Sequence, residues 1–281
     1  MQTIESPAGM AEWARETRAA GHTIAFVPTM GSLHEGHLSL MRAARHRADR
    51  LVVSIFVNPL QFGAGEDLDT YPRDPRGDAA KCEDVGVDLL FTPTTASLFP
   101  PGFQTTLLAG PLAAPLCGST RPAFFNGIVT VVLKLFNLVR PTVAAFGRKD
   151  FQQFAVLSRM VRDLDLDVEM LGLPTIREAD GLAMSSRNAY LSTSDRQEAL
   201  ALPRGLADVR ASFEAGERSA AALGRALREG IEAQPAARVD YVEILDAEDL
   251  TEVDLIRRPV VAAVAAFFGP TRLIDNVVLT P

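Results

Sequence analysis

The most constraining feature of this 281-residue chain is a short apolar run that leads into a glycine-containing turn and then a helix. Residues 23–28 are mostly apolar and rich in β-branched side chains, as expected for a buried strand. The turn at residues 28–37 follows, and apolar residues after it recur near a helical period up to residue 48. A strand, a turn and a helix in this order predict the first βα unit of an α/β protein.

The same alternation continues along the first 175 residues. A surface helix is predicted at residues 9–20, and the remaining predicted elements are strands at 51–57, 87–92, 143–146 and 168–173 and helices at 79–85, 128–139 and 150–163. Such repetition predicts a doubly wound parallel (Rossmann-like) sheet. Residues 93–122 contain many Pro and Gly residues and predict a long excursion with short strands.

The composition changes after Pro174, which indicates a second domain. Residues 196–232 are rich in Ala, Arg and Glu and predict two helices that are divided near Gly216. Strands are predicted at 239–244, 260–267 and 272–279. We therefore expect a Rossmann-like domain at residues 1–175 and a smaller C-terminal α+β domain at residues 176–281.

Composition also narrows the function classes. A formal net charge of −7 argues against a nucleic-acid-binding surface. No signal peptide or membrane-spanning apolar run is expected. Cys82 and Cys117 lack metal-site spacing, and a cytoplasmic location is expected. Asp67, Asp69 and Asp78 are expected to be surface carboxylates, so no metal ligand is assigned.

Two histidines make the turn at residues 28–37 a candidate phosphate site. His34 and His37 are three residues apart at the start of the predicted helix, so they lie on nearly one side of it. Helix N-termini present unpaired N–H groups and a positive dipole to anions. Gly36 leaves room for a ligand to approach the backbone. A pair of surface histidines is the alternative interpretation.

Other polar segments are predicted at the same edge of the sheet. Residues 28–37, 58–63 and 147–150 each follow a strand, and ligands of doubly wound sheets bind beyond the carboxyl ends of the strands. Residues 181–188 form a hydroxyl-rich loop with a cation near its end, which suits phosphate oxygens; a solvated turn is the alternative. Three single residues also have alternative interpretations: a solvated side chain for Gln61, an ion pair with a carboxylate for Lys149 and a position in the core for Met30.

Four motifs in collinear order resemble those of one family. They are residues 28–37 (Pro-Thr-Met-Gly-Ser-Leu-His-Glu-Gly-His), 54–62 (Ser-Ile-Phe-Val-Asn-Pro-Leu-Gln-Phe), 149–153 (Lys-Asp-Phe-Gln-Gln) and 180–188 (Asp-Gly-Leu-Ala-Met-Ser-Ser-Arg-Asn). The first and last are similar to the paired signatures of the nucleotidyl-transferase superfamily. Together the four resemble the pantoate–β-alanine ligase (pantothenate synthetase) family. Residues 271–276 (Thr-Arg-Leu-Ile-Asp-Asn) extend the resemblance toward the carboxyl terminus.

The resemblance implies an ATP-dependent, cytoplasmic ligase of the pantothenate pathway. The pantoate carboxylate attacks the α-phosphorus of ATP to give pantoyl adenylate and pyrophosphate. The amine of β-alanine then attacks the acyl carbon and releases AMP. Mg²⁺ is expected on the ATP phosphates, held mainly by phosphate and water. The family is commonly dimeric, so a homodimer is implied, and the C-terminal domain is expected to close over the site.

The resemblance also implies roles for individual residues. His34 and His37 would donate to phosphate oxygens, with His37 the residue most often assigned as proton donor. The expected ATP-binding residues are Met30, Gly31, His34, His37, Gly147, Lys149, Asp150, Ile176, Met184, Ser185, Ser186 and Arg187. The expected catalytic residues among them are His34, His37, Lys149, Ser185, Ser186 and Arg187. The expected acid and amine site contains Met30, Asn58, Gln61 and Gln153.

Three positions depart from the family pattern. Arg148 stands where the family has a glutamate before the lysine, and Phe124 stands where it has a histidine in the turn at residues 123–127. An aspartate pair is reduced to Asp78. The altered turn, which includes Asn126, approaches the acid and amine pocket, so ligation of a different acid and amine is an alternative. A nucleotide-binding protein without turnover is a third interpretation.

Overall fold

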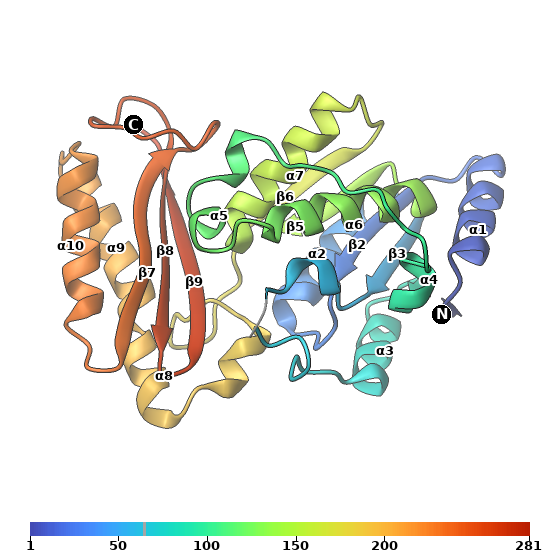
Figure 1. Cartoon of the computed structure of the whole chain (residues 1–281), viewed down its shortest axis with the longest axis horizontal. Helices are drawn as coiled ribbons and strands as arrows, with labels where there is room; N and C mark the ends of the chain where they lie inside the picture. Colours follow the sequence, from blue (N-terminus) through green and yellow to red (C-terminus); the bar gives the residue numbers. More distant parts are fainter. Residues whose placement is uncertain (64–65) are drawn as a thin grey trace. The chain divides into compact units, whose positions relative to one another are not determined.

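The computed structural model describes residues 1–63 and 66–281, which divide into two compact units (Figure 1). The first unit comprises Met1–Ala113, Arg121–Arg148 and Gln153–Pro174, and the second comprises Ala114–Thr120, Lys149–Gln152 and Thr175–Pro281. Two short segments, 114–120 and 149–152, thus group with the carboxyl-terminal unit.

The first unit is built on a six-stranded parallel sheet in the order β1-β4-β3-β2-β5-β6. Its strands are β1 (Gln2–Ile4), β2 (Ile24–Thr29), β3 (Arg50–Ile55), β4 (Leu89–Phe91), β5 (Val143–Gly147) and β6 (Glu169–Leu173). The strand order reverses between β2 and β5. This confirms the predicted doubly wound sheet, and the switch point at which such sheets bind ligands lies at the carboxyl ends of these two strands.

Alternation along β2 explains how helices cover both faces of this sheet. Ala25 and Val27 point to one face and share a core cluster with α2, whereas Phe26 points to the other face. There its ring meets that of Phe136 in α6, with 6.3 Å between the ring centroids. The helices are α1 (Pro7–Ala19), α2 (Glu35–Arg45), α3 (Pro75–Asp84), α4 (Thr95–Leu98), α6 (Phe124–Val139) and α7 (Phe151–Asp163).

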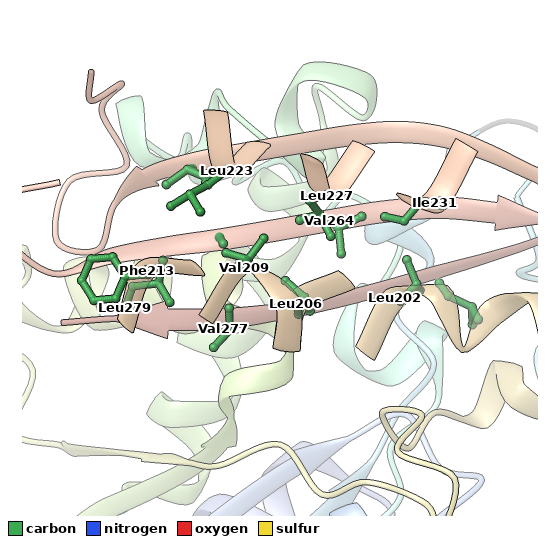
Figure 2. Packing of buried hydrophobic residues seen from close by; sticks show 14 of the residues in the cluster. Leu202, Leu206, Val209, Phe213, Leu223, Leu227, Ile231, Val264, Val277 and Leu279 are labelled. Atoms are coloured by element: carbon green, nitrogen blue, oxygen red, sulfur yellow. The ribbon is translucent and has the colours of Figure 1, made fainter. Parts of the chain in front are cut away.

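The second unit contains the predicted smaller α+β fold. An antiparallel sheet pairs β7 (Ala237–Asp246), β8 (Val260–Phe268) and β9 (Thr271–Leu279) in sequence order. Its helices are α5 (Cys117–Thr120), α8 (Thr193–Ala199), α9 (Ala201–Glu214) and α10 (Ala220–Glu232). Helices α9 and α10 lie along the sheet in Figure 1. Figure 2 shows their apolar residues, at intervals of three or four, packed on Val264, Val277 and Leu279.

Residues 93–122 do not contain the short strands that the sequence predicted. All of them are described, and they form α4, α5 and the one-turn helix η2 (Pro111–Ala113) between irregular stretches. Parts of this segment hydrogen-bond to helix side chains instead of to a strand: the Leu107 N–H donates to Thr130 Oγ1 and the Ala109 N–H to Asn126 Oδ1. Strand β1 was not predicted, because three residues are too few for a periodic pattern.

Helix α6 begins at Phe124, four residues before its predicted start, so the expected turn at residues 123–127 is the first turn of this helix. It ends at Val139, where Arg140 adopts a left-handed conformation before Pro141. Across the described residues, no helix combines the length and the apolar character that crossing a membrane requires.

Gly127 is required by a close approach of two backbones. Its Cα in α6 faces the turn η1 (Pro59–Gln61), and a Cβ added there would lie 2.1 Å from the Leu60 carbonyl oxygen. Asn58 Nδ2 donates to the Gly127 carbonyl at 3.1 Å. The first turn of α6 is therefore the support on which residues 58–61 rest.

Replacing Gly127 with alanine is expected to destabilise the protein, because the Leu60 backbone blocks the new methyl group. Overpacking costs about 1–3 kcal/mol of unfolding free energy, which urea denaturation measures. Gly224→Ala in α10 is the matched control, since nothing lies within 4 Å of its added Cβ. That substitution is expected to be neutral or to stabilise by about 0.5–1 kcal/mol. Equal effects of both substitutions would contradict the close approach.

Candidate active site

The turn after β2 adopts a backbone conformation that needs external support. Gly31 and Ser32 both have positive φ angles, +85° and +51°, and a left-handed serine is uncommon. Asp78 in α3 supplies the support: its carboxylate accepts from the Ser32 N–H at 2.8 Å and from the Leu33 N–H at 2.7 Å. Lys81, one helical turn further, donates to the Leu33 carbonyl at 2.8 Å. The turn is thus held by α3 on both its N–H and its C=O groups.

The prediction that Asp78 is a surface carboxylate is wrong. Its exposed fraction is 1%, and it lies on the same face of α3 as the buried Cys82. Burial raises the pKa of the Cys82 thiol to about 12, and the nearby Asp78 carboxylate adds to this. Residue type alone favours an exposed carboxylate, so sequence reasoning had no signal for this burial.

His34 and His37 lie together at the start of α2, as predicted. Their ring centroids are 4.1 Å apart. His34 Nδ1 accepts from the Gly36 N–H at 3.1 Å, and His37 Nδ1 accepts from the His34 N–H at 3.3 Å. A neutral imidazole that accepts at Nδ1 carries its proton on Nε2. Both rings are therefore set to donate through Nε2, next to the positive end of a helix.

The loop after β3 brings three of the predicted substrate residues together. Asn58 is buried, and its Nδ2 donates to Gln61 Oε1 at 3.2 Å as well as to the backbone of α6. Gln61 Nε2 lies 2.8 Å from the sulfur of Met30. Gln61 is consequently not a plainly solvated side chain. Gln153 lies in the first turn of α7, just after β5, and is half-buried.

The departure at residue 148 has a local explanation. The Arg148 guanidinium lies over the Phe154 ring, 5.8 Å from its centroid. Gly172 in β6 leaves room for this arrangement, because a Cβ there would lie 2.9 Å from Arg148 Nε. The added cation is thus placed on an aromatic face, where cation–π attraction stabilises it. Gly147 directly before it is the last residue of β5.

In the second unit, the strand β9 holds the segment that contains Lys149. Asn276 Nδ2 donates to the Lys149 carbonyl at 2.8 Å. Lys149 Nζ lies 3.8 Å from Asp150 Oδ2, so the predicted alternative of a pair with Asp150 is present. About half of the Asp150 side chain is exposed. Asn276 was quoted in the sequence motif at residues 271–276 but was not assigned a role.

The predicted hydroxyl-rich loop continues a small hairpin. Arg177 pairs with Ala183, and the Met184 N–H donates to the Ile176 carbonyl at 2.9 Å. The Arg177 guanidinium binds both carboxylate oxygens of buried Asp275 in β9, at 2.6 and 3.0 Å. Sequence reasoning missed this pair, since a contact between residues 98 apart has no local signal. Ser185 is the N-cap of the short helix η4 (Ser186–Tyr190), and its Oγ accepts from the Arg187 N–H.

Acidic side chains stiffen the same hairpin. Asn188 Nδ2 donates to Glu178 Oε1 at 2.6 Å, and Arg196 bridges Glu178 and Asp180. Partial burial opposes ionisation of Asp180, but the Leu182 N–H and the Arg196 guanidinium outweigh it, so the pKa of Asp180 lies below its usual value.

The candidate residues therefore fall into two groups. Those in the first unit are Met30, Gly31, His34, His37, Asn58, Gln61, Gly147 and Gln153, and those in the second are Lys149, Asp150, Ile176, Met184, Ser185, Ser186 and Arg187. Each group combines donors or cations with segments that are fixed by backbone hydrogen bonds. Such an arrangement suits positioning and charge neutralisation, which are the main requirements of phosphoryl and nucleotidyl transfer.

Comparison with known proteins gives a consistent result over the whole chain. A family model described as pantoate-beta-alanine ligase matches residues 2–278. Pantothenate synthetase from Heliobacterium modesticaldum is 53% identical over 279 residues, which is 99% of each chain. That from Desulfatibacillum aliphaticivorans is 50% identical over the full length of both chains.

Solved structures agree with these relatives. The crystal structure of pantothenate synthetase from Thermus thermophilus superposes with a TM-score of 0.94 at 45% identity and covers 100% of both chains. Pantoate-beta-alanine ligase from Francisella tularensis, complexed with beta-gamma ATP and beta-alanine, has a TM-score of 0.80 at 29% identity, with 99% of this chain and 97% of that one covered. The chain belongs to the pantoate-beta-alanine ligase family.

Proposed function

We propose that this chain is an ATP-dependent ligase that joins pantoate to β-alanine through a pantoyl adenylate. The proposal follows from family membership over residues 2–278. The structural observation that carries it is the His34–His37 pair at the carboxyl end of β2, in which both rings accept backbone N–H groups at Nδ1. That position is the switch point of the doubly wound sheet, where such folds bind nucleotides.

The reaction proceeds in two steps, formation of the adenylate and then formation of the amide. A carboxylate oxygen of pantoate attacks the α-phosphorus of ATP, and the bond to the bridging oxygen of pyrophosphate breaks. The nitrogen of β-alanine then attacks the acyl carbon, the bond to AMP breaks, and the ammonium nitrogen loses a proton as the amide forms. His34 and His37 donate through Nε2 to phosphate oxygens as negative charge builds on them, and the helix N-terminus adds to this stabilisation.

Each remaining predicted residue has a role in this proposal. Lys149 and Arg187 neutralise phosphate charge, and the hydroxyl groups of Ser185 and Ser186 hold the departing pyrophosphate. Asp150 accepts from ribose hydroxyl groups. The remaining nucleotide contacts are Met30, Gly31, Gly147, Ile176 and Met184. The acid and amine are bound by Gln61 and Gln153 with Asn58 and Met30.

Mg²⁺ would accompany ATP and neutralise charge on its phosphates. The described residues contain no group of three or more His, Cys, Asp or Glu side chains that could hold a metal ion. Phosphate oxygens and water would therefore supply most of its ligands, as Mg²⁺ commonly accepts.

We also propose that the protein is a cytoplasmic homodimer and that its domains comprise residues 1–175 and 176–281.

Exchange of radiolabelled pyrophosphate into ATP tests the substrate assignment, because it requires reversible adenylate formation. Exchange is expected with pantoate and not with a panel of other short hydroxy acids. Exchange only with another acid would assign the same chemistry to a different substrate. Nucleotide binding without exchange for any acid would leave a binding protein without turnover.

His37→Ala is expected to lower the exchange rate about 10²- to 10³-fold, because it removes a donor that acts on developing charge. Rapid-quench measurement of adenylate formation at saturating ATP would show the loss in the first step. His46→Ala, at the exposed end of the same helix, is the control and should retain the parent rate. A His37→Ala variant with a rate near that of the parent would refute this role.

Asp78→Asn is expected to lower both stability and exchange activity, because one amide group cannot accept from the Ser32 and Leu33 N–H groups as a carboxylate does. A buried donor left unsatisfied costs about 1–3 kcal/mol, measurable by urea denaturation. Asp69→Asn, at an exposed position, should change neither quantity. An Asp78→Asn protein with unchanged exchange rate would show that the turn keeps its conformation without this carboxylate.

A further inference from the structure

Arg121 in the first unit is fixed on its edge and on its face by two different side chains. Its Nε donates to Glu66 Oε1 at 2.6 Å, and its Nη2 donates to Glu66 Oε2. The guanidinium carbon lies 3.7 Å from the centroid of the Phe124 ring. Only 17% of the Arg121 side chain and 27% of the Glu66 side chain are exposed. A bidentate ion pair and a stacked aromatic ring leave the guanidinium one orientation.

The fixed guanidinium also reaches the loop that carries the acid-binding amide. Arg121 Nη2 donates to the backbone carbonyl of Gln61 at 3.1 Å. The side chain of the same residue is held separately by Asn58 and Met30. Gln61 is thus restrained at its main chain and at its amide group by different partners.

Phe124 takes part in this arrangement through its uncharged ring. It occupies the first position of α6, and Gly127 in the same helical turn packs against the Leu60 carbonyl. The start of α6 therefore supports residues 58–61 directly through Gly127. Through Phe124 it also orients the Arg121 guanidinium, which donates to the Gln61 carbonyl. A neutral aromatic face favours an adjacent guanidinium.

We propose that Arg121, held by Glu66 and Phe124, is a positioning residue that sets the affinity for the acid substrate by placing Gln61. This inference rests on the proposed function, in which the Gln61 amide binds pantoate. Arg121 acts through the Gln61 backbone and does not itself bind the acid. It follows that loss of the guanidinium weakens acid binding and leaves the ATP site unchanged.

The test compares Arg121→Met and Arg121→Lys with the parent enzyme in pantoate-dependent ATP–pyrophosphate exchange. A lost hydrogen bond from a charged group predicts that the KM for pantoate rises about tenfold or more, while the KM for ATP stays within about twofold. Lysine keeps the charge but cannot form the bidentate pair, so it should not restore the parent value. An unchanged KM for pantoate in either folded variant, or an equal rise in both KM values, would overturn the proposal.

Arg218→Met is the matched control. Arg218 also lies over a phenylalanine ring, 4.1 Å from the centroid of Phe213, and donates to backbone carbonyls, but in the second unit. Its loss should leave the KM for pantoate unchanged. Glu66→Gln provides a milder variant: it weakens the hold on Arg121 and should raise the KM for pantoate without unfolding the chain.

A double-mutant cycle distinguishes positioning from general support. Adding Arg121→Lys to Gln61→Ala should raise the KM for pantoate no further, because the residue through which Arg121 acts has already lost its amide. Additive effects would overturn the proposal. Parent enzyme that shows no pantoate-dependent exchange would refute the proposed function instead, so the two failures are distinguishable.

Discussion

The buried carboxylate of Asp78 is the interaction on which the candidate site most depends. The turn contains two consecutive residues with positive φ angles, and a left-handed conformation is unfavourable for the non-glycine residue Ser32. Two hydrogen bonds from the Ser32 and Leu33 N–H groups to one carboxylate fix the turn. His34 follows Leu33 directly and is the N-cap of α2, and His37 lies in the first turn of the same helix. The contact with Asp78 therefore also positions the backbone that carries both imidazole rings. A residue of the β3–β4 connection thereby controls the end of β2.

The same principle recurs at the other candidate residues, whose side chains are placed through contacts with their main chains. Asn276 holds the carbonyl of Lys149, and Asp275 holds the hairpin that leads to Ser185 through Arg177. Backbone contacts of this kind position a residue without using its own side chain. They also fix the point from which that side chain extends, and precise placement is what charge stabilisation in a transition state requires.

Much of this architecture was predictable because it follows from local patterns. Apolar runs identified the central strands β2, β3 and β5, and the polar loops that follow these strands predicted the edge of the sheet at which a ligand is expected. The short strand β1 and the helices within residues 93–122 lack a periodic signal, so they were missed or assigned wrongly. The burial of Asp78 and the pairing of Arg177 with Asp275 were also beyond reach. Both depend on contacts between distant residues, and residue type alone favours exposure of a carboxylate.

The tight connection between β8 and β9 has a consequence for how the chain can vary in length. Phe268 pairs with Thr271, so only Gly269 and Pro270 separate the two strands. Neighbouring side chains of β9 point to opposite faces, with Asp275 buried against Arg177 and Asn276 bonded to Lys149. One inserted residue in this connection would move a carboxylate to the carbonyl of Lys149 and an isoleucine to the guanidinium of Arg177. The length of this hairpin therefore sets the register in which β9 contacts Lys149 and Arg177, and insertions should be tolerated elsewhere in the second unit before they are tolerated here.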